Sequence, residues 1–185
     1  MKKIIPILLL FISSYTFSQN ESCDGIRFID DVFTEVETTK GLKYGENTEI
    51  YGTFKELFLD VYQPANDIAE NRPVIIVAFG GSFIQGTRED VAFLCEAFAR
   101  KGFVAVGIDY RLFDGALFPP PTAIEMTEVV IKAVADSKAA IRYLRNDAAN
   151  DNHFRIDPNM IFASGISAGA IAACHTAVLD STDIF

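Results

Sequence analysis

The spacing of apolar and polar positions changes near residue 73. Residues 33–62 carry alternating and β-branched positions, are interrupted by glycines, and close at LFLDVYQP, which predicts a β-hairpin or meander. Three continuous apolar runs follow: VIIVAF after Pro73, FVAVGI from Phe103 and MIFASG from Met160. Runs of this length are typical of strands buried on both faces of a sheet.

Helical patterns separate and follow these runs. In TREDVAFLCEAFARKG, Thr87 can cap a helix with Asp90, apolar residues recur on one face, and Gly102 ends the segment. A long helix follows the Pro-rich stretch FPPP, and AGAIAACHTAVLD predicts a third. In the long helix the apolar positions recur at helical spacing: Val130, Val134, Ile141 and Leu144. The alternation of strands and helices predicts an α/β fold, with a mostly parallel sheet covered by helices on both faces.

The amino-terminal segment MKKIIPILLLFISSYTFSQN has two lysines, a short apolar run and then small polar residues. It predicts a signal peptide over residues 1–18, cleavage after Ser18, and a secreted or periplasmic protein, because the run is too short for a membrane span. Residues 19–185 are expected to form one domain, since half of the residues are hydrophobic and sixteen are phenylalanine.

Charge narrows the range of partners. Without Lys2 and Lys3 the formal net charge of −9 becomes about −11, which argues against binding nucleic acid or anionic lipid. The three cysteines, Cys23, Cys95 and Cys174, lack the spacing of a metal site or a disulfide framework. Cys95 and Cys174 fall on apolar faces of predicted helices, and we expect both to be buried free thiols.

The sequence Gly165-Ile166-Ser167-Ala168-Gly169 is a G-x-S-x-G motif. It lies directly between a predicted buried strand and a predicted helix, which is the context of a nucleophile elbow. Such a turn holds the serine in a strained conformation at the carboxyl edge of the sheet, where its hydroxyl can attack a carbonyl. Chance alone produces the bare motif in some chains of this length, so its placement carries the argument.

A second motif, FGGSF at residues 79–83, follows the first buried strand. Acyl transfer requires N–H donors directed at the oxygen that becomes negative, and a glycine-rich loop at a strand end supplies them. We expect the amides of Gly81 and Ser82, joined by that of Ala168, to form this oxyanion hole. An ordinary glycine-rich turn is the alternative, which the nearby elbow makes less favourable.

These motifs, with LFLDVYQP, GIDYRL, DSKAAIRYLRNDA and IDPNMIFASGISAGA, resemble the α/β-hydrolase fold, and more narrowly the carboxylesterase and hormone-sensitive-lipase-like esterases. The resemblance covers residues 56–180. It implies hydrolysis of small-molecule or carbohydrate-linked carboxylic esters through a Ser-His-Asp/Glu triad and an acyl-enzyme, without a metal or organic cofactor. Where relatives commonly have His-Gly-Gly-Gly, this chain has Phe79-Gly80-Gly81-Ser82, which keeps the backbone donors but changes the acyl pocket.

The base required by this mechanism is missing from the pattern. His153 precedes the third buried strand and is expected at the opposite edge of the sheet, whereas His175 lies about 12 Å along the helix after Ser167. In the family the acid and the histidine follow later strands, so we expect the chain to be the amino-terminal part of an esterase. The strand at 160–165 would then be an exposed edge.

Two further classes of function stay open. One is a non-catalytic, hydrolase-like binding module or an inactive truncated product, against which the intact elbow argues. The other comprises serine peptidases, lipases and thioesterases, which share the elbow. Asp109, Tyr110 and Arg111 follow a strand end near the site, and in the esterases that the chain resembles this stretch is mainly structural. On the long helix, Asp136, Arg142 and Arg145 are interpreted as solvated or paired charges.

Overall fold

The computed structural model describes residues 25–179. The predicted signal peptide, its cleavage site and Cys23 lie outside these residues. The elements, in chain order, are β1 (Val36–Thr48), β2 (Phe54–Pro64), β3 (Arg72–Ala78), the 3-10 helix η1 (Arg88–Val91), α1 (Ala92–Arg100), β4 (Val104–Ile108), α2 (Ala123–Asn150), β5 (Ile156–Gly165) and α3 (Ala168–Val178). Every strand and helix expected from the pattern after residue 33 is therefore confirmed.

The described strands form one sheet in the order β1-β2-β4-β3-β5. β1 and β2 form the expected antiparallel hairpin, and β2 pairs antiparallel with β4. β3 pairs parallel with both β4 and β5. The register places the last residues of these three strands side by side, because Ala78 is opposite both Ile108 and Gly165. The connections after β3, β4 and β5 consequently leave the sheet at one edge, where α/β proteins place their ligands.

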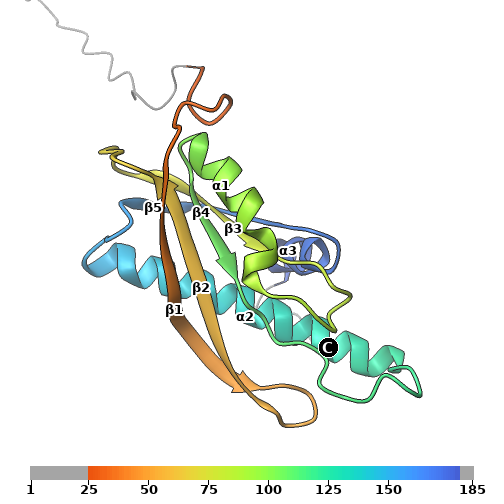
Figure 1. Ribbon diagram of the computed structural model, residues 1–185. Helices are drawn as coiled ribbons and strands as arrows, with labels where there is room; N and C mark the ends of the chain where they lie inside the picture. The colour runs from red at the N-terminus through yellow and green to blue at the C-terminus, as the bar shows by residue number, and fades with distance from the viewer. Residues whose placement is uncertain (1–24, 180–185) are drawn as a thin grey trace, which may run out of the picture.

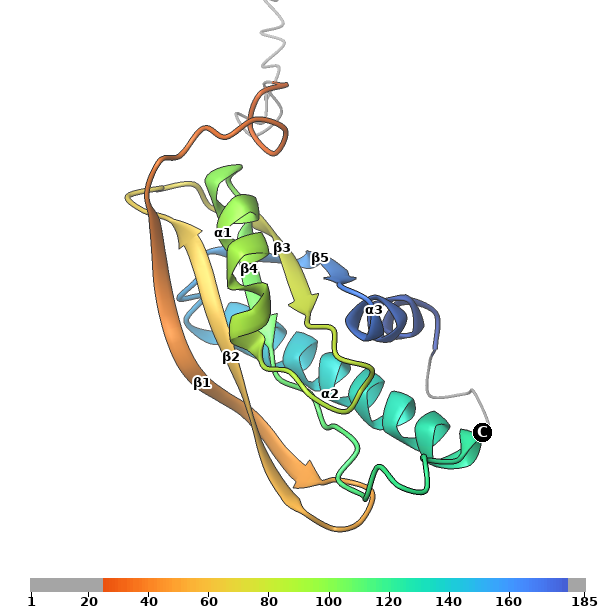
Figure 2. The ribbon, with the colours of Figure 1, turned by 45° about the vertical axis from the view of Figure 1, so that its right-hand side comes forward.

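Helices cover both faces of the sheet, as the mostly parallel topology requires. α1 lies on one face, and α2 runs across the opposite face (Figure 1). α3 packs against β5, β3 and α2, and therefore shares the α2 face (Figure 2). The connection from β4 through α2 to β5 passes behind β3, as expected for a crossover between parallel strands.

Local sequence explains where the helices begin. The Thr87 amide donates a hydrogen bond to the Asp90 carboxylate at 2.8 Å, at the start of η1. At α2, Thr122 and Glu125 form a reciprocal capping box, in which the Thr122 amide donates to the Glu125 carboxylate at 2.6 Å. Buried residues of α1 and α2 then reach the core from both faces: Cys95, Ala99, Val129, Ala133, Ala140 and Leu144.

One burial prediction is wrong. Cys95 is fully buried between α1 and the sheet, but Cys174 is exposed. The buried side of α3 is formed by its small residues, Ala168, Gly169, Ala172, Ala173 and Thr176. Because α3 is apolar on nearly all sides, the periodicity of its sequence does not identify the side that faces α2 and the sheet.

β5 forms the outer edge of the described sheet, as predicted. Its side chains Met160 and Phe162 are 44% and 51% exposed. Within residues 25–179, none of the helices combines the length and the apolar character needed to cross a bilayer.

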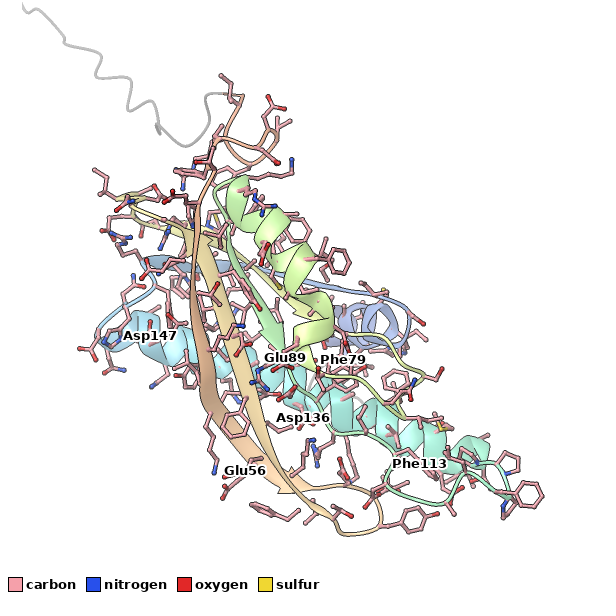
Figure 3. The ribbon with its side chains drawn as sticks, in the orientation of Figure 1. Glu56, Phe79, Glu89, Phe113, Asp136 and Asp147 are labelled. Carbon is pink, nitrogen blue, oxygen red and sulfur yellow. The ribbon has the colours of Figure 1, made fainter. Side chains whose placement is uncertain are left out.

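Buried ion pairs join the strand ends to the helices. Arg111, just after β4, donates three side-chain hydrogen bonds of 2.8–3.0 Å to the Asp136 carboxylate of α2. Asp136 lies on α2 behind the sheet (Figure 3). Arg88 bonds Asp60 and Asp109, both at 2.8 Å. The structural interpretation of Asp109 and Arg111 is therefore confirmed, and of the two alternatives for Asp136, solvated or paired, the structure shows the paired one.

Candidate active site

Ser167 occupies a strained turn between β5 and α3. Its φ and ψ are 52° and −115°, a conformation that a residue with a side chain rarely adopts. The Ile166 amide donates to the Ala78 carbonyl at 3.1 Å, which ties the turn to the end of β3. The strained conformation expected for the elbow serine is confirmed, and the Ser167 side chain is exposed to solvent.

Gly165 and Gly169, the two glycines of the motif, make this turn possible because neighbouring backbone segments approach them closely. A Cβ atom at position 165 would lie 2.4 Å from the backbone carbon of Gly169. A Cβ atom at position 169 would lie 2.1 Å from the Ala78 carbonyl oxygen. Strand, turn and helix are thus in backbone contact, which only residues without side chains permit.

The glycine-rich loop after β3 lies directly beside the elbow. A Cβ atom on Gly80 would be 3.3 Å from Cβ of Ser167 and 3.0 Å from the Ile166 carbonyl oxygen. Gly81 has a φ of 129° and its carbonyl accepts hydrogen bonds from Ile84 and Gln85, which close the loop into a turn. The two sequence motifs are therefore brought together, as the common strand edge predicts.

The amide donors proposed for an oxyanion hole have no acceptor within the described part of the chain. The N–H groups of Gly81, Ser82 and Ala168 form no hydrogen bond to any group of residues 25–179. Ala168 is the first residue of α3, where backbone N–H groups lack partners within the helix and the helix dipole is positive. Such donors favour an oxygen that acquires negative charge.

An aromatic pair holds the loop in position. The ring of Phe79 stacks on that of Tyr110 with centroids 4.2 Å apart, and the Tyr110 hydroxyl donates to the Phe79 carbonyl at 2.6 Å. Phe79 lies at the end of β3 near the start of α1 (Figure 3). Burial raises the pKa of Tyr110, so it stays protonated and keeps this bond at physiological pH. Phe79, which stands where the resembled esterases commonly have histidine, thus anchors the glycine-rich loop to Tyr110.

Neither histidine approaches the elbow. Nδ1 of His153 lies 2.6 Å from Oδ1 of Asp147, in the turn before β5, at the other end of that strand from Ser167. Nδ1 of His175 lies 2.8 Å from the Ile171 carbonyl oxygen of its own helix. Across residues 25–179, no side chain forms a hydrogen bond with the Ser167 hydroxyl.

Clusters of three or more His, Cys, Asp or Glu side chains able to hold a metal ion are absent from the described residues.

The sequence predicted the elbow and the glycine-rich loop, but it did not predict the pair formed by Phe79 and Tyr110. The sequence did carry a signal for this pair. Phe79 directly follows β3, Tyr110 lies two residues after β4, and the ends of these two strands meet at one edge of the sheet.

The fold and the elbow define an α/β-hydrolase of the carboxylesterase type. Its sequence matches the BD-FAE family model over residues 59–185, which is well over half of the chain. The chain belongs to the BD-FAE family.

Two relatives with similar sequences bear the names of esterases. The chain is 33% identical over 136 residues to a probable isoprenylcysteine alpha-carbonyl methylesterase of Oryza sativa subsp. japonica, covering 71% of this chain and 28% of that protein. It is 30% identical over 152 residues to fumonisin B1 esterase of Sphingopyxis macrogoltabida, covering 80% and 27%. The chain thus spans about a quarter of the length of these curated relatives.

Solved structures of an esterase are also similar to this chain. The apo form of Thermogutta terrifontis esterase 2 is 34% identical, with a TM-score of 0.54, covering 76% of this chain and 44% of that one. The same esterase phosphoramylated by tabun is 31% identical, with a TM-score of 0.53, covering 77% and 47%. The chain therefore spans about half of the solved esterase chains.

Proposed function

We propose that this chain carries the nucleophile and the oxyanion hole of a serine carboxylic-ester hydrolase. The supporting observation is the contact between the glycine-rich loop and the strained elbow, with Gly80 directly beside Ser167. Oγ of Ser167 adds to the ester carbonyl carbon while a base takes its proton, which gives a tetrahedral oxyanion. Collapse of this intermediate breaks the C–O bond to the alcohol, which leaves with that proton, and water then hydrolyses the acyl-enzyme. The amides of Gly81, Ser82 and Ala168 hold the oxyanion of the intermediate.

The reaction requires a base for the Ser167 proton, and the two histidines of the chain are placed elsewhere. We propose that the histidine and its acidic partner come from polypeptide outside this sequence. The activity is accordingly that of the whole protein. We also propose that residues 1–18 direct its export, which amino-terminal sequencing of the mature protein tests.

A fluorophosphonate probe tests the nucleophile, because it modifies only a serine that is activated for attack. In the protein that contains this chain, we expect the probe on the peptide that holds Ser167, and Ser167→Ala should abolish both labelling and ester hydrolysis. Ser164→Ala, three residues earlier on β5, is the matched control and should retain both. Esterase turnover that persists at the wild-type rate in Ser167→Ala would exclude the assignment.

The same labelling experiment distinguishes the esterase from the second candidate function, a hydrolase-like binding module without catalysis. That reading is favoured by the absence of a base near Ser167 among residues 25–179. It requires that the probe leave Ser167 unmodified in the whole, folded protein while a reference serine hydrolase in the same tube is labelled.

A further inference from the structure

The β1–β2 hairpin extends past the edge of the sheet where Ser167 lies. Leu59 of β2 is opposite Ile108, the last residue of β4, yet β2 begins at Phe54. At ~3.3 Å per residue, the hairpin projects about 16 Å beyond that edge. The tip at residues 49–53 therefore stands on the same side of the molecule as the elbow.

Specific contacts fix this tip to the loop that leads from β4 to α2. The amides of Tyr51 and Thr53 donate to the two carboxylate oxygens of Asp114 at 2.9 and 3.2 Å. The Tyr51 ring meets Phe113 edge to face, with centroids 5.8 Å apart, and its hydroxyl donates to the Glu125 carboxylate. Both ribbon views show the hairpin tip beside this loop (Figures 1 and 2), and Phe113 lies within it (Figure 3).

A cavity of about 350 Å³ lies between the tip and the start of α2. It is an open cavity, because Tyr51 is 60% exposed. Most of its lining residues carry rings, and Thr122 and Glu125 add polar side chains; the ring residues are Tyr51, Phe113, Pro119, Pro120 and Pro121. This volume is at the lower end of the range for ligand pockets, ~300–1,000 Å³, and suits a group the size of one ring system. The cavity is formed by segments that are distant in sequence and held together by the contacts above.

Charge determines which rings this cavity accepts. Its lining includes the Glu125 carboxylate and neither lysine nor arginine. A hydrogen bond to Glu125 and the negative charges of Glu125, Asp114 and Glu128 raise the pKa of Tyr51, so the phenol stays neutral. An anionic ligand would meet this negative field without a counter-charge, whereas a neutral ring would not.

The cavity is remote from the reacting bond, so only a long substrate molecule would occupy both places. The ends of β5, β3 and β4 are successive along the sheet, so β4 ends about 10 Å from β5 at ~4.8 Å per strand. The tip that bounds the cavity projects about 16 Å beyond that edge, so a group bound there would lie roughly 20 Å from an ester carbonyl held at Ser167.

We propose that this cavity is a substrate subsite that binds a neutral, ring-sized apolar group at the far end of a long ester substrate, and that it excludes anionic groups. The identification of the bound group as part of an ester rests on the proposed function. Binding of the ring itself does not, because none of the lining residues belongs to the elbow or the glycine-rich loop.

Binding is measured without turnover in the Ser167→Ala variant of the whole protein at pH 7. 2-Naphthol, which is neutral, and 2-naphthoate, which is anionic, are titrated and followed by amide chemical shifts in a ¹⁵N-labelled sample. We expect 2-naphthol to perturb residues 51–53 and 113–125, and 2-naphthoate to bind at least about 5-fold more weakly. Equal affinities, or perturbations confined to other surfaces, overturn the proposal.

Matched variants assign the binding to the cavity. Tyr51→Ala should weaken 2-naphthol binding about 5-fold to 10-fold, whereas Tyr51→Phe, which keeps the ring, should bind like the parent. Gly115→Ala should also weaken binding, because its Cβ would lie 2.4 Å from the Tyr51 ring and 2.7 Å from that of Phe113. Phe93→Ala removes an aromatic ring that is 64% exposed on α1 and serves as the control. Unchanged affinity in both Tyr51→Ala and Gly115→Ala overturns the proposal.

Charge and turnover complete the test. Glu125→Gln should narrow the difference between 2-naphthol and 2-naphthoate, and a difference that stays the same contradicts the role of the carboxylate. In the whole protein, Tyr51→Ala should lower the ratio of kcat/KM for esters with a distal ring to that for ethyl acetate, whereas the control Phe93→Ala should leave both values unchanged. If no ester is hydrolysed but 2-naphthol still binds in the Tyr51-dependent manner, the proposed function fails and the neutral-ring site stands.

Discussion

Gly169, in the first turn of α3, lies against the carbonyl group of Ala78 at the end of β3. A Cβ atom on residue 169 would stand 2.1 Å from the Ala78 oxygen and 2.5 Å from that of Phe79. This contact sets the distance between the elbow and the strand that leads into the glycine-rich loop. The position of Ser167 relative to the proposed oxyanion donors therefore depends on the absence of a single methyl group.

We expect Gly169→Ala to destabilise the chain by about 3 kcal/mol, because the obstacle is backbone and cannot move aside. Urea denaturation followed by circular dichroism measures the change. Gly45→Ala, in β1, is the control, since its Cβ would meet only a Leu57 methyl group at 4.0 Å. A Gly169→Ala chain as stable as Gly45→Ala would show that the elbow is not packed as described.

Ser167→Gly should stabilise the chain by about 1 kcal/mol, because glycine adopts a φ of 52° without strain. Ser164→Gly, within β5, should instead lower the free energy of unfolding by about 0.5–1 kcal/mol. Glycine relieves no strain there, and it raises the conformational entropy of the unfolded chain. The difference between the two denaturation midpoints measures strain stored at the elbow. Destabilisation by the same amount at both positions would exclude such strain.

Asp136→Asn should be strongly destabilising, by about 3 kcal/mol, because it leaves the buried Arg111 guanidinium without its counter-charge. Glu46→Gln breaks an exposed ion pair with Lys43 and serves as the control, for which we expect no measurable change. Thermal and urea denaturation of both variants give the comparison. Equal stability of the two would mean that burial of the Arg111–Asp136 pair is unimportant.

The two described cysteines should differ sharply in reactivity. Burial, and then the charge of Asp60, raise the pKa of Cys95 to about 12, whereas Cys174 is exposed. In a Cys23→Ser background at pH 8, Ellman's reagent should react with one thiol, and Cys174→Ser should abolish that reaction.

Raising the pH to 10 should leave native Cys95 unmodified, because the thiolate fraction is still ~1% two pH units below the pKa. Unfolding in guanidinium should release it. Rapid labelling of Cys95 in the native Cys174→Ser chain would contradict its burial.

The strands and the elbow could be predicted from sequence because their signals are local. β3 and β4 are buried on both faces, so VIIVAF and FVAVGI are apolar without interruption. The elbow is a contiguous motif whose glycines are required by contacts within and next to it. The resemblance to the carboxylesterases rested on these same residues and is confirmed by the family match.

The side of α3 that faces the protein could not be predicted in this way. Ile171 and Cys174 are exposed although both are apolar, while Gly169, Ala172 and Thr176 are buried. Their small size allows α3 to approach β3 and α2 closely. A helix that is apolar on nearly all sides gives no periodic signal, so the choice of face depends on its neighbours.

The sequence alone determined the order of strands and helices, the strained serine turn and the glycine-rich loop, because each depends on residues within a few positions of one another. Only the tertiary structure decided that Gly80 touches Ser167, that Phe79 stacks on Tyr110, and that the Tyr51 hairpin tip closes a cavity against Phe113. These contacts join residues separated by tens of positions. They are set by strand order and register, which backbone pairing fixes only when the whole sheet assembles.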